Sequence, residues 1–484
     1  MRKLSILIAI ILFMAGCSKP PENQAVLEGN LKGEIPDSIE IKFHKNDYLE
    51  KPVIQTVQLD EKGTFSIKLP VQELKKFRVQ LNPEEEVEMM LKPGWNMMLQ
   101  AKIKEDFSLD TLNFEGKGGQ ENEIYQRFDK IAFKAYDHIR EKPARFIEVL
   151  DSLEKEMTTL MQNKESLDED FLSMMKNDIY YNKVGRWNSY KMYAGRYNHT
   201  LDTGFVNDFE AKLLSDISLN DPSLMTSSYF RSFLEDTLTK AARDMIDQKA
   251  LEEKYEKNEE LYQAYRVNYV KNLFNITDSL IDQPEIKKHA FYHGMLRNLR
   301  VQTLDMNKQI FNNRFKEVVK DEEMLNEVKQ RLTKLDKLTP GNPAPEFSYP
   351  DKEGNMVHLD DLKGQYVYLD IWATWCGPCV GEIPNLKKLH KKYGDEIAFV
   401  SVSVDPRKKD WEKFVEKRNL EGYQLYSGKN FDSEIIHDYM VKGIPRFVMI
   451  DPEGKIIDVN APRPSSEQTE KMMKEWIEDS GNEA

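Results

Sequence analysis

Two cysteines three positions apart, Cys376 and Cys379, are the residues of this chain best suited to chemistry. The run 366–371 before them is apolar and rich in β-forming residues, and apolar residues recur at helical spacing after them. Cys376 is therefore expected between the end of a strand and the start of a helix. Backbone N–H groups and the helix dipole there stabilise a thiolate and can lower its pKa from about 8.5 into a range of roughly 3.5 to 7.5. Cys379, one turn further along, is placed to resolve a mixed disulfide, so the pair predicts thiol–disulfide exchange.

Other uses of a Cys-X-X-Cys pair fit this sequence poorly. A zinc site needs two further ligands, but the chain has no second such pair, and the histidines nearest in sequence are isolated. A c-type haem needs a histidine after the second cysteine, where Val380 stands. A thiol peroxidase would be expected to carry a proline-led turn shortly before its reactive cysteine, and no proline stands close before Cys376. We predict no metal and no cofactor other than the redox-active Cys376–Cys379 disulfide.

The first residues of the chain indicate export and lipid attachment. A basic pair precedes the apolar run 4–13, which is too short to span a bilayer and is typical of a signal peptide. Small residues stand immediately before Cys17 and resemble a lipobox, so we expect a signal peptide over 1–17, a lipid on Cys17 and a polar tether over 18–24. Plain secretory cleavage is the alternative. With only 3 cysteines in the chain, none is left for a structural disulfide.

Length and charge limit the organisation of the chain and its partners. A chain of 484 residues is too long for a single domain of ordinary size. The net charge of −13 arises from segments of mixed sign, which argues against binding to nucleic acid and against electrostatic adhesion to an anionic membrane. Attachment to a membrane would instead depend on several acyl chains on Cys17, because one chain binds only marginally.

Residues 25–115 predict an antiparallel β-sandwich-like domain. Short alternating segments recur there, separated by turn signals, at 38–43, 64–69, 77–81 and 97–100.

Residues 120–338 predict a central α-helical domain, because apolar residues recur there with helical spacing. One such stripe consists of Phe146, Val149, Leu150, Leu153, Met157, Leu160 and Met161. The aromatic residues between Tyr180 and Tyr197 are expected to pack between helices. His289 and His293 stand one helical turn apart, but no third metal ligand is evident, so solvent-facing histidines are predicted.

Residues 340–484 alternate between strand and helix patterns and predict an α/β domain. We expect strands at 366–371, 397–404, 446–450 and 455–459, and helices at 376–393, 408–418 and 466–477. The continuous apolar run of the second strand suits a parallel strand buried on both faces.

The segment Trp-Cys-Gly-Pro-Cys at 375–379 resembles the active site of thioredoxins. Asp370 matches their buried acid, Pro384 their helix-kinking proline, and Ile444-Pro445 their cis-proline loop. The segments 341–347, 351–354 and 359–364 resemble the leader hairpin of the TlpA/ResA-like extracytoplasmic branch, and Glu382 matches an acid that recurs in it. More coarsely, the β-rich region resembles the N-terminal domain of thioredoxin-like lipoproteins of Bacteroidetes-type bacteria.

The resemblance implies a thioredoxin-like domain from about Gly341 to the C-terminus and a role for each matching residue. Cys376 attacks, Cys379 resolves, and Asp370 accepts or relays a proton. Glu382 holds charge or water at the site, although acids also favour first helical turns for simpler reasons. Contacts to the substrate are implied for Trp375, Gly377, Pro378, Ile444 and a cis Pro445.

Together these features favour a membrane-tethered extracytoplasmic thiol-disulfide oxidoreductase. Gly377-Pro378 resembles the reducing members, so we expect reduction of protein disulfides with a membrane electron donor. The sequence leaves the substrate open between an apocytochrome of cytochrome c maturation, another lipoprotein and a general pool of proteins. Ser18 after the lipid-bearing cysteine points to the outer membrane and a periplasm-facing protein. Two alternatives remain open, namely a binding or envelope-assembly lipoprotein with an ancillary thioredoxin-like module, and a disulfide oxidase.

Overall fold

The computed structural model describes most of the chain beyond its N-terminus. The described residues are 23–43, 52–82, 85–162, 166–197, 199–201, 203–215, 217–246 and 259–482. The chain forms two compact units, one of Met1–Met245 with Leu273–His293 and one of Ile246–Asn272 with Gly294–Ala484. The expected signal peptide over 1–17, Cys17 and most of the tether lie outside the described residues, and the first strand begins at Gln24.

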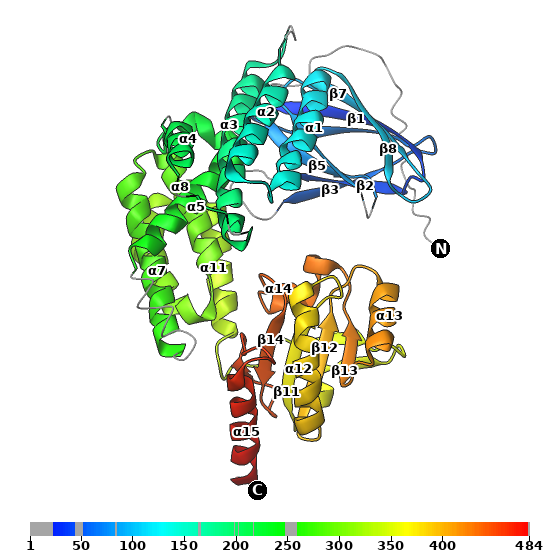
Figure 1. The fold of residues 1–484 in the computed structure, drawn as a ribbon. Coiled ribbons are helices and arrows are strands. Elements are labelled where there is room, and N and C mark those ends of the chain that lie inside the picture. The colour runs from blue at the N-terminus through cyan, green and yellow to red at the C-terminus, as the bar shows by residue number, and fades with distance from the viewer. Residues whose placement is uncertain are drawn as a thin grey trace. The chain divides into compact units, whose positions relative to one another are not determined.

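Eight strands at the start of the first unit form a β-sandwich (Figure 1). One sheet has the order β4-β1-β7-β8 and consists of β4 (Thr64–Pro70), β1 (Gln24–Gly33), β7 (Asn96–Ile103) and β8 (Leu109–Gly116). The other has the order β3-β2-β5-β6 and consists of β3 (Val53–Gln58), β2 (Ser38–Phe43), β5 (Lys75–Gln80) and β6 (Glu86–Leu91). Alternate side chains of both sheets, such as Leu27, Ile41 and Leu99, are buried in one core.

This sandwich confirms the predicted β-rich domain, with one difference in strand direction. β1 and β7 pair in parallel, while the other strand pairs of the two sheets are antiparallel. A parallel pair needs a long crossover connection, and the chain between these two strands supplies it.

The helical part that follows is confirmed as well. Its elements are α1 (Gly119–Phe133), α2 (Pro143–Thr159), α3 (Glu169–Ala194), α4 (Gly204–Leu214), α5 (Ser228–Asp244), α7 (Glu259–Leu280) and α8 (Pro284–Asn298). The apolar stripe of α2 is buried, and its Phe146 ring stacks 4.2 Å from the ring of Tyr190 on α3. Trp187 on α3 is also fully enclosed, so Tyr190 and Trp187 pack between helices as expected, whereas Tyr197 is 37 % exposed.

The prediction of solvent-facing histidines on α8 is wrong for His289, which is only 2 % exposed. The reason is that α8 is covered on most of its surface, with Ile286, Phe291, Tyr292 and Met295 all fully buried. A helix enclosed on most faces leaves no open face for a histidine in its middle.

The second unit contains the helices α9 (Leu304–Ile310), α10 (Lys316–Val318) and α11 (Glu322–Lys337), followed by an α/β domain. A short antiparallel hairpin of β9 (Ser348–Pro350) and β10 (Met356–His358) leads into that domain. Its five-stranded sheet has the order β13-β12-β11-β14-β15, consisting of β13 (Tyr423–Tyr426), β12 (Ile397–Ser403), β11 (Tyr366–Trp372), β14 (Arg446–Ile450) and β15 (Ile456–Asp458). The first three strands are parallel, and the last two run against them.

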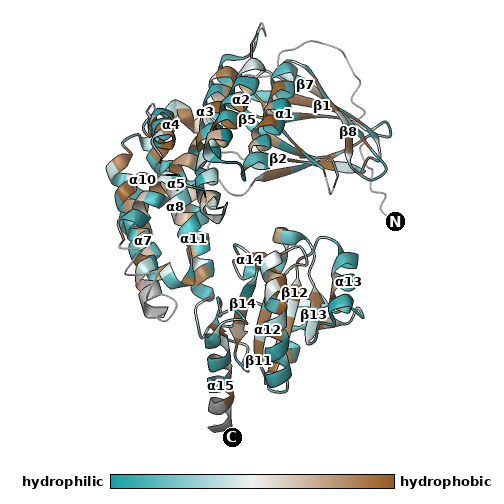
Figure 2. Cartoon of the chain, viewed as in Figure 1, coloured by the Kyte–Doolittle hydropathy of each residue, from teal (hydrophilic) through white to brown (hydrophobic). Residues whose placement is uncertain are grey.

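Helices cover both faces of this sheet. Leu389 of α12 (Gly377–Tyr393) and Met473 of α15 (Glu467–Asn482) belong to the core on one face. Trp411 of α13 (Lys408–Arg418) and Ile435 of α14 (Glu434–Asp438) belong to the core on the other. The sheet strands are largely apolar and α13 is largely polar, as Figure 2 shows in brown and teal. This is the arrangement that buries parallel strands on both sides.

The predicted strands and helices of this domain agree with the structure to within a few residues, but β13 and α14 were not anticipated. β13 is four residues long and half-buried between two turn glycines, Gly422 and Gly428. Such a segment has too few residues to show a periodic pattern.

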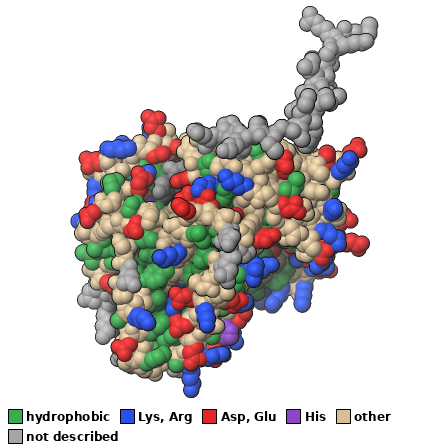
Figure 3. Space-filling model, turned by 90° about the horizontal axis from the view of Figure 1, so that it is seen from above, with side chains coloured by type: hydrophobic (Ala, Val, Ile, Leu, Met, Phe, Trp, Pro, Cys, Tyr) green, Lys and Arg blue, Asp and Glu red, His purple; other side chains and the backbone are tan. Residues whose placement is uncertain are grey.

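The surface carries charges of both signs. On the face shown in Figure 3, acidic and basic side chains are interspersed. Among the described residues, no helix has both the length and the apolar character that a membrane crossing requires.

Candidate active site

The end of β11 and the start of α12 place the two cysteines. Cys376 is the N-cap of α12, and its Sγ accepts a hydrogen bond from the backbone N–H of Cys379 at 3.2 Å. Gly377 and Pro378 occupy the first turn and are exposed. A proline is favourable there because the first N–H groups of a helix have no partner within it. The sulfur of Cys376 therefore lies where the helix dipole favours negative charge.

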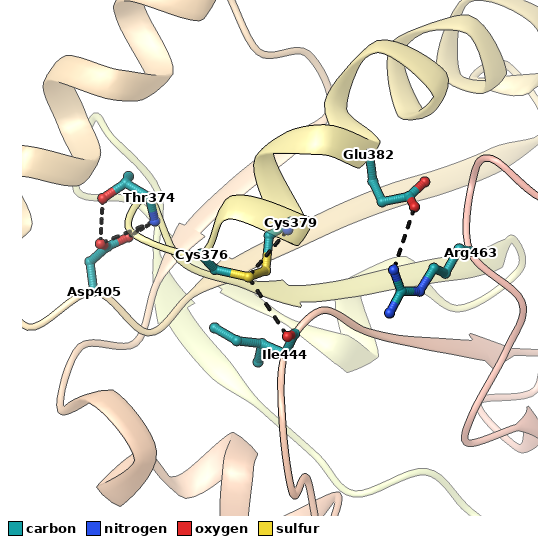
Figure 4. The surroundings of a disulfide bond; sticks show 7 residues. All are labelled: Thr374, Cys376, Cys379, Glu382, Asp405, Ile444 and Arg463. Atoms are coloured by element: carbon teal, nitrogen blue, oxygen red, sulfur yellow. Dashed lines mark hydrogen bonds and ion pairs between the residues drawn. A yellow bond between two sulfur atoms is a disulfide. The ribbon is translucent and has the colours of Figure 1, made fainter. Parts of the chain in front are cut away.

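The two cysteines form a disulfide whose Cα atoms are 5.2 Å apart (Figure 4). Both residues are largely buried, with Cys376 5 % and Cys379 4 % exposed. The Ile444–Pro445 peptide bond is cis, and the carbonyl oxygen of Ile444 lies 3.7 Å from the sulfur of Cys376. A disulfide sulfur has no proton to donate, so this is a contact in the oxidised form and becomes a possible hydrogen bond once the thiol is present.

A buried carboxylate that the sequence did not reveal holds the turn before Cys376. Asp405 is 1 % exposed and accepts hydrogen bonds from the backbone N–H of Thr374 at 3.0 Å and from its hydroxyl at 2.6 Å. The hydroxyl of Ser403 also donates to Asp405, at 2.6 Å. Figure 4 shows this clamp on the side of the disulfide away from Glu382. Because the acceptor is charged and enclosed, these bonds fix the path of the chain into the active site.

Asp370 lies beneath the site in the middle of β11. It is 8 % exposed, and its Oδ1 atom has no hydrogen-bond partner within the described part of the chain. Burial, and secondly the negative charge of Glu382, raise the pKa of Asp370 from 3.8 to about 8. A group with this pKa exchanges a proton readily near neutral pH.

A small cavity of about 20 Å³ borders Asp370, and Ser401 and Gln424 contribute polar groups to its lining. That volume suffices for one water molecule.

Glu382 is held in place from outside its own helix. Its carboxylate accepts hydrogen bonds from the backbone N–H and the hydroxyl of Ser465, both at 2.9 Å. Arg463 approaches it at 3.9 Å, and Figure 4 shows these two charges meeting beside the disulfide. The side chain is 11 % exposed, and three donors from the segment before α15 hold its carboxylate at the edge of the site.

An apolar surface surrounds the approach to the disulfide. Trp375 is 51 % exposed, and its ring lies 6.3 Å from the ring of Phe431, which is itself 40 % exposed. Trp372 is different, because it is buried and packs against Phe414 in the core. Exposed aromatic pairs of this kind suit contact with a partner surface.

One large cavity of the second unit is not the reacting site. It measures about 740 Å³ and is lined in part by Pro445, Arg446 and Phe447, but by neither cysteine. The disulfide therefore lies beside the Ile444–Pro445 loop without lining this cavity.

The structure brings together the candidate residues Cys376, Cys379, Ile444 and Pro445 and places Asp370 and Glu382 within electrostatic reach of each other. Sequence reasoning missed Asp405, Phe431 and Ser465. Asp405 had one usable signal, since an acid directly after a parallel strand lies at the carboxyl edge of the sheet, where the active-site turn also lies. The other two come from distant loops and left no local signal.

Comparison with known proteins adds independent information about this domain. A profile of the AhpC/TSA family matches residues 340–459. The chain is 33 % identical over 147 residues to thiol-disulfide oxidoreductase ResA of Bacillus thuringiensis subsp. konkukian, covering 30 % of this chain and 81 % of that protein. It is 32 % identical over 136 residues to thioredoxin-like protein YneN of Bacillus subtilis, covering 28 % and 78 %. A crystal structure of the thioredoxin domain of a thiol-disulfide oxidoreductase from Bacteroides vulgatus is 32 % identical, covers 28 % of this chain and 99 % of that one, and has a TM-score of 0.26.

Proposed function

The chain belongs to the ResA-like thiol-disulfide oxidoreductases, and we propose that it reduces disulfide bonds of other proteins through Cys376 and Cys379. The observation that carries the proposal is the position of Cys376 at the N-terminus of α12, with its sulfur already accepting a backbone N–H. This position favours the thiolate, which is the attacking species in disulfide exchange.

The reaction proceeds in two exchange steps. The Cys376 thiolate attacks one sulfur of the substrate disulfide, so that a mixed disulfide forms and the other substrate sulfur leaves as a thiolate. The Cys379 thiolate then attacks the sulfur of Cys376 and releases the second substrate sulfur. The substrate gains two electrons, and the protein is left with the Cys376–Cys379 disulfide that the structure contains.

Asp370 and Glu382 support the second step. Cys379 must lose its proton before it attacks, and Asp370, with a pKa of about 8, is the buried group suited to take that proton. Burial, and secondly the charge of Glu382, keep the pKa of Asp370 close to the ordinary thiol pKa of about 8.5, so that proton transfer between the thiol and the carboxylate is close to balanced.

Docking of the substrate uses the surface around Cys376. The exposed rings of Trp375 and Phe431 supply apolar contact, and the cis peptide of Ile444–Pro445 presents a backbone edge beside the sulfur. An extended segment of a substrate protein can pair with such an edge. Gly377 and Pro378 are exposed and leave room for it.

The protein works outside the cytoplasm in this proposal. The apolar run 4–13 and the small residues before Cys17 support export and lipid attachment, and Ser18 favours the outer membrane and the periplasm-facing side. An extracytoplasmic compartment is oxidising, so the disulfide must be reduced again by an electron donor in the membrane.

Trapping of the intermediate tests the mechanism. The chain from Ser18 onward retains all described elements and removes the third cysteine. This protein and its C376S and C379S variants are reduced, separated from the reductant and then mixed with oxidised insulin. We expect C379S to accumulate a mixed disulfide with the substrate and C376S to form none. Exchange that persists in C376S would overturn the assignment. If C376S restores the phenotype of cells that lack the protein, binding rather than disulfide exchange is its cellular role.

A further inference from the structure

Three potential metal ligands meet in the first unit, far from the disulfide in sequence. Glu235 on α5 lies 3.1 Å from Nε2 of His289, and 4.0 Å from Nδ1 of His293, both on α8. One ligand atom from each of the three residues lies within 4.8 Å of the other two. Figure 1 shows α5 and α8 side by side, so the cluster joins two helices that are separated by 54 residues at the Glu235–His289 contact.

The spacing of the two histidines explains how one helix supplies both. Residues four apart lie on the same helix face, about one turn from each other. The ring centroids of His289 and His293 are 4.3 Å apart. Two histidines at this spacing on a helix are a recurring source of two zinc ligands, and the third ligand then has to come from a different element. Glu235 is that residue here, and no pattern in the sequence could have connected it to the pair.

The burial of the cluster suits a metal ion that enters from solvent. The side chain of His289 is 2 % exposed, while those of Glu235 and His293 are 11 % and 19 % exposed. The inner ligand is therefore enclosed, and the outer two border the surface. A carboxylate enclosed beside imidazole rings is costly unless its charge is matched, and a divalent cation supplies the matching charge.

We propose that Glu235, His289 and His293 form a zinc site that joins α5 to α8. Zinc takes nitrogen from histidine and oxygen from glutamate at about 2.0–2.2 Å, which in a tetrahedral site places ligand atoms roughly 3.4 Å apart. The largest separation here is at most 4.8 Å, so closure requires side-chain movements of about 1.4 Å or less.

The ligand set also selects the class of metal. Two imidazoles exclude calcium and magnesium, which prefer oxygen ligands, and favour zinc or a similar transition metal. Three protein ligands leave a fourth tetrahedral position for water. Zinc at this position competes with the direct hydrogen bond between Glu235 and His289, and it stabilises the first unit by binding the folded state.

Metal titration tests this site with little interference from the redox centre. The chain from Ser18 onward is used with Cys376 and Cys379 oxidised, because disulfide sulfurs do not bind zinc as thiolates do. Zn²⁺ binding is measured by competition with a chromophoric chelator, for the parent, for H293N and E235Q, and for a control variant with H358N and H437N. The control removes two exposed histidines of the other unit.

We expect one equivalent of zinc per chain in the parent and the control, and affinity lowered at least about tenfold in H293N and E235Q. Zinc should raise the melting temperature of the parent and leave that of H293N unchanged. A second readout does not depend on the variants: Co²⁺ added to the parent should give the intense visible absorption of a tetrahedral site. The proposal would be overturned if the parent protein with Co²⁺ lacked this absorption, or if H293N bound zinc as tightly as the parent. Either result would show that the cluster is only a hydrogen-bonded pair with a neighbouring histidine.

Discussion

Replacing Asp370 with asparagine should stabilise the C-terminal domain more and more as the pH rises. The pKa of Asp370 is raised from 3.8 to about 8 by burial and by the charge of Glu382. A carboxyl group with a raised pKa contributes stability that is fully present below pH 3.8 and is lost as the pH rises through about 8. Asparagine does not titrate and loses nothing over the same range.

The size of the effect follows from the two pKa values. At about 1.4 kcal/mol per pH unit, the raised pKa of Asp370 lowers the free energy of unfolding by about 4 kcal/mol at pH 7, where the carboxyl group ionises mainly in the unfolded state, and by about 6 kcal/mol above pH 8. A whole domain is stable by only about 5–15 kcal/mol, so the difference between the parent and D370N should be easy to measure.

The assay has to report on the C-terminal domain alone, because a chain of several units does not unfold in one step. Proteolysis in a urea series, with peptides from β11 followed by mass spectrometry, gives that local free energy of unfolding at pH values from about 4 to about 9. All proteins are kept oxidised. D395N serves as a matched control, since Asp395 is an exposed acid of the same domain.

The predicted result is a stability difference between D370N and the parent that grows between about pH 4 and pH 8 and then levels off. The difference between D395N and the parent should stay flat. A D370N curve parallel to the parent curve at every pH would refute the reasoning, because it would mean that Asp370 ionises normally despite its burial.

Three further results are expected around the same site. E382Q should lower the pKa of Asp370, because it removes the negative charge beside that carboxyl group. The stability difference between E382Q and the double variant E382Q/D370N should therefore level off at a lower pH than the difference between the parent and D370N. D405A leaves the Thr374 N–H without its acceptor and should lower the free energy of unfolding by about 3 kcal/mol in urea titration, whereas D432A, an exposed control, should not. W375A should raise KM for a protein disulfide by about tenfold, and by much less for a small disulfide. Equal KM increases for both substrates would argue against a docking role.

Much of the C-terminal domain could be predicted because its signals are local. The change from the apolar strand 366–371 to helical spacing after Cys379 located β11 and α12 within one or two residues. The alternating pattern of 38–43 located β2 for the same reason, since it depends on neighbours in sequence.

The contacts that complete the sites could not be predicted in this way. Asp405 meets Thr374 from 31 residues away, and Ser465 meets Glu382 from 83 residues away. Glu235 joins His289 only because α5 packs beside α8. No periodic pattern in the sequence predicts such contacts, because they depend on how whole helices and strands pack against one another. The same packing buries His289, which was predicted to face solvent.

The midpoint potential of the Cys376–Cys379 couple tests the central claim most directly. It can be measured by equilibrating the chain from Ser18 onward in thiol redox buffers. A reductase of protein disulfides predicts a value near that of thioredoxin, about −270 mV. A value near about −120 mV would make the protein an oxidant and contradict the direction of electron flow proposed here.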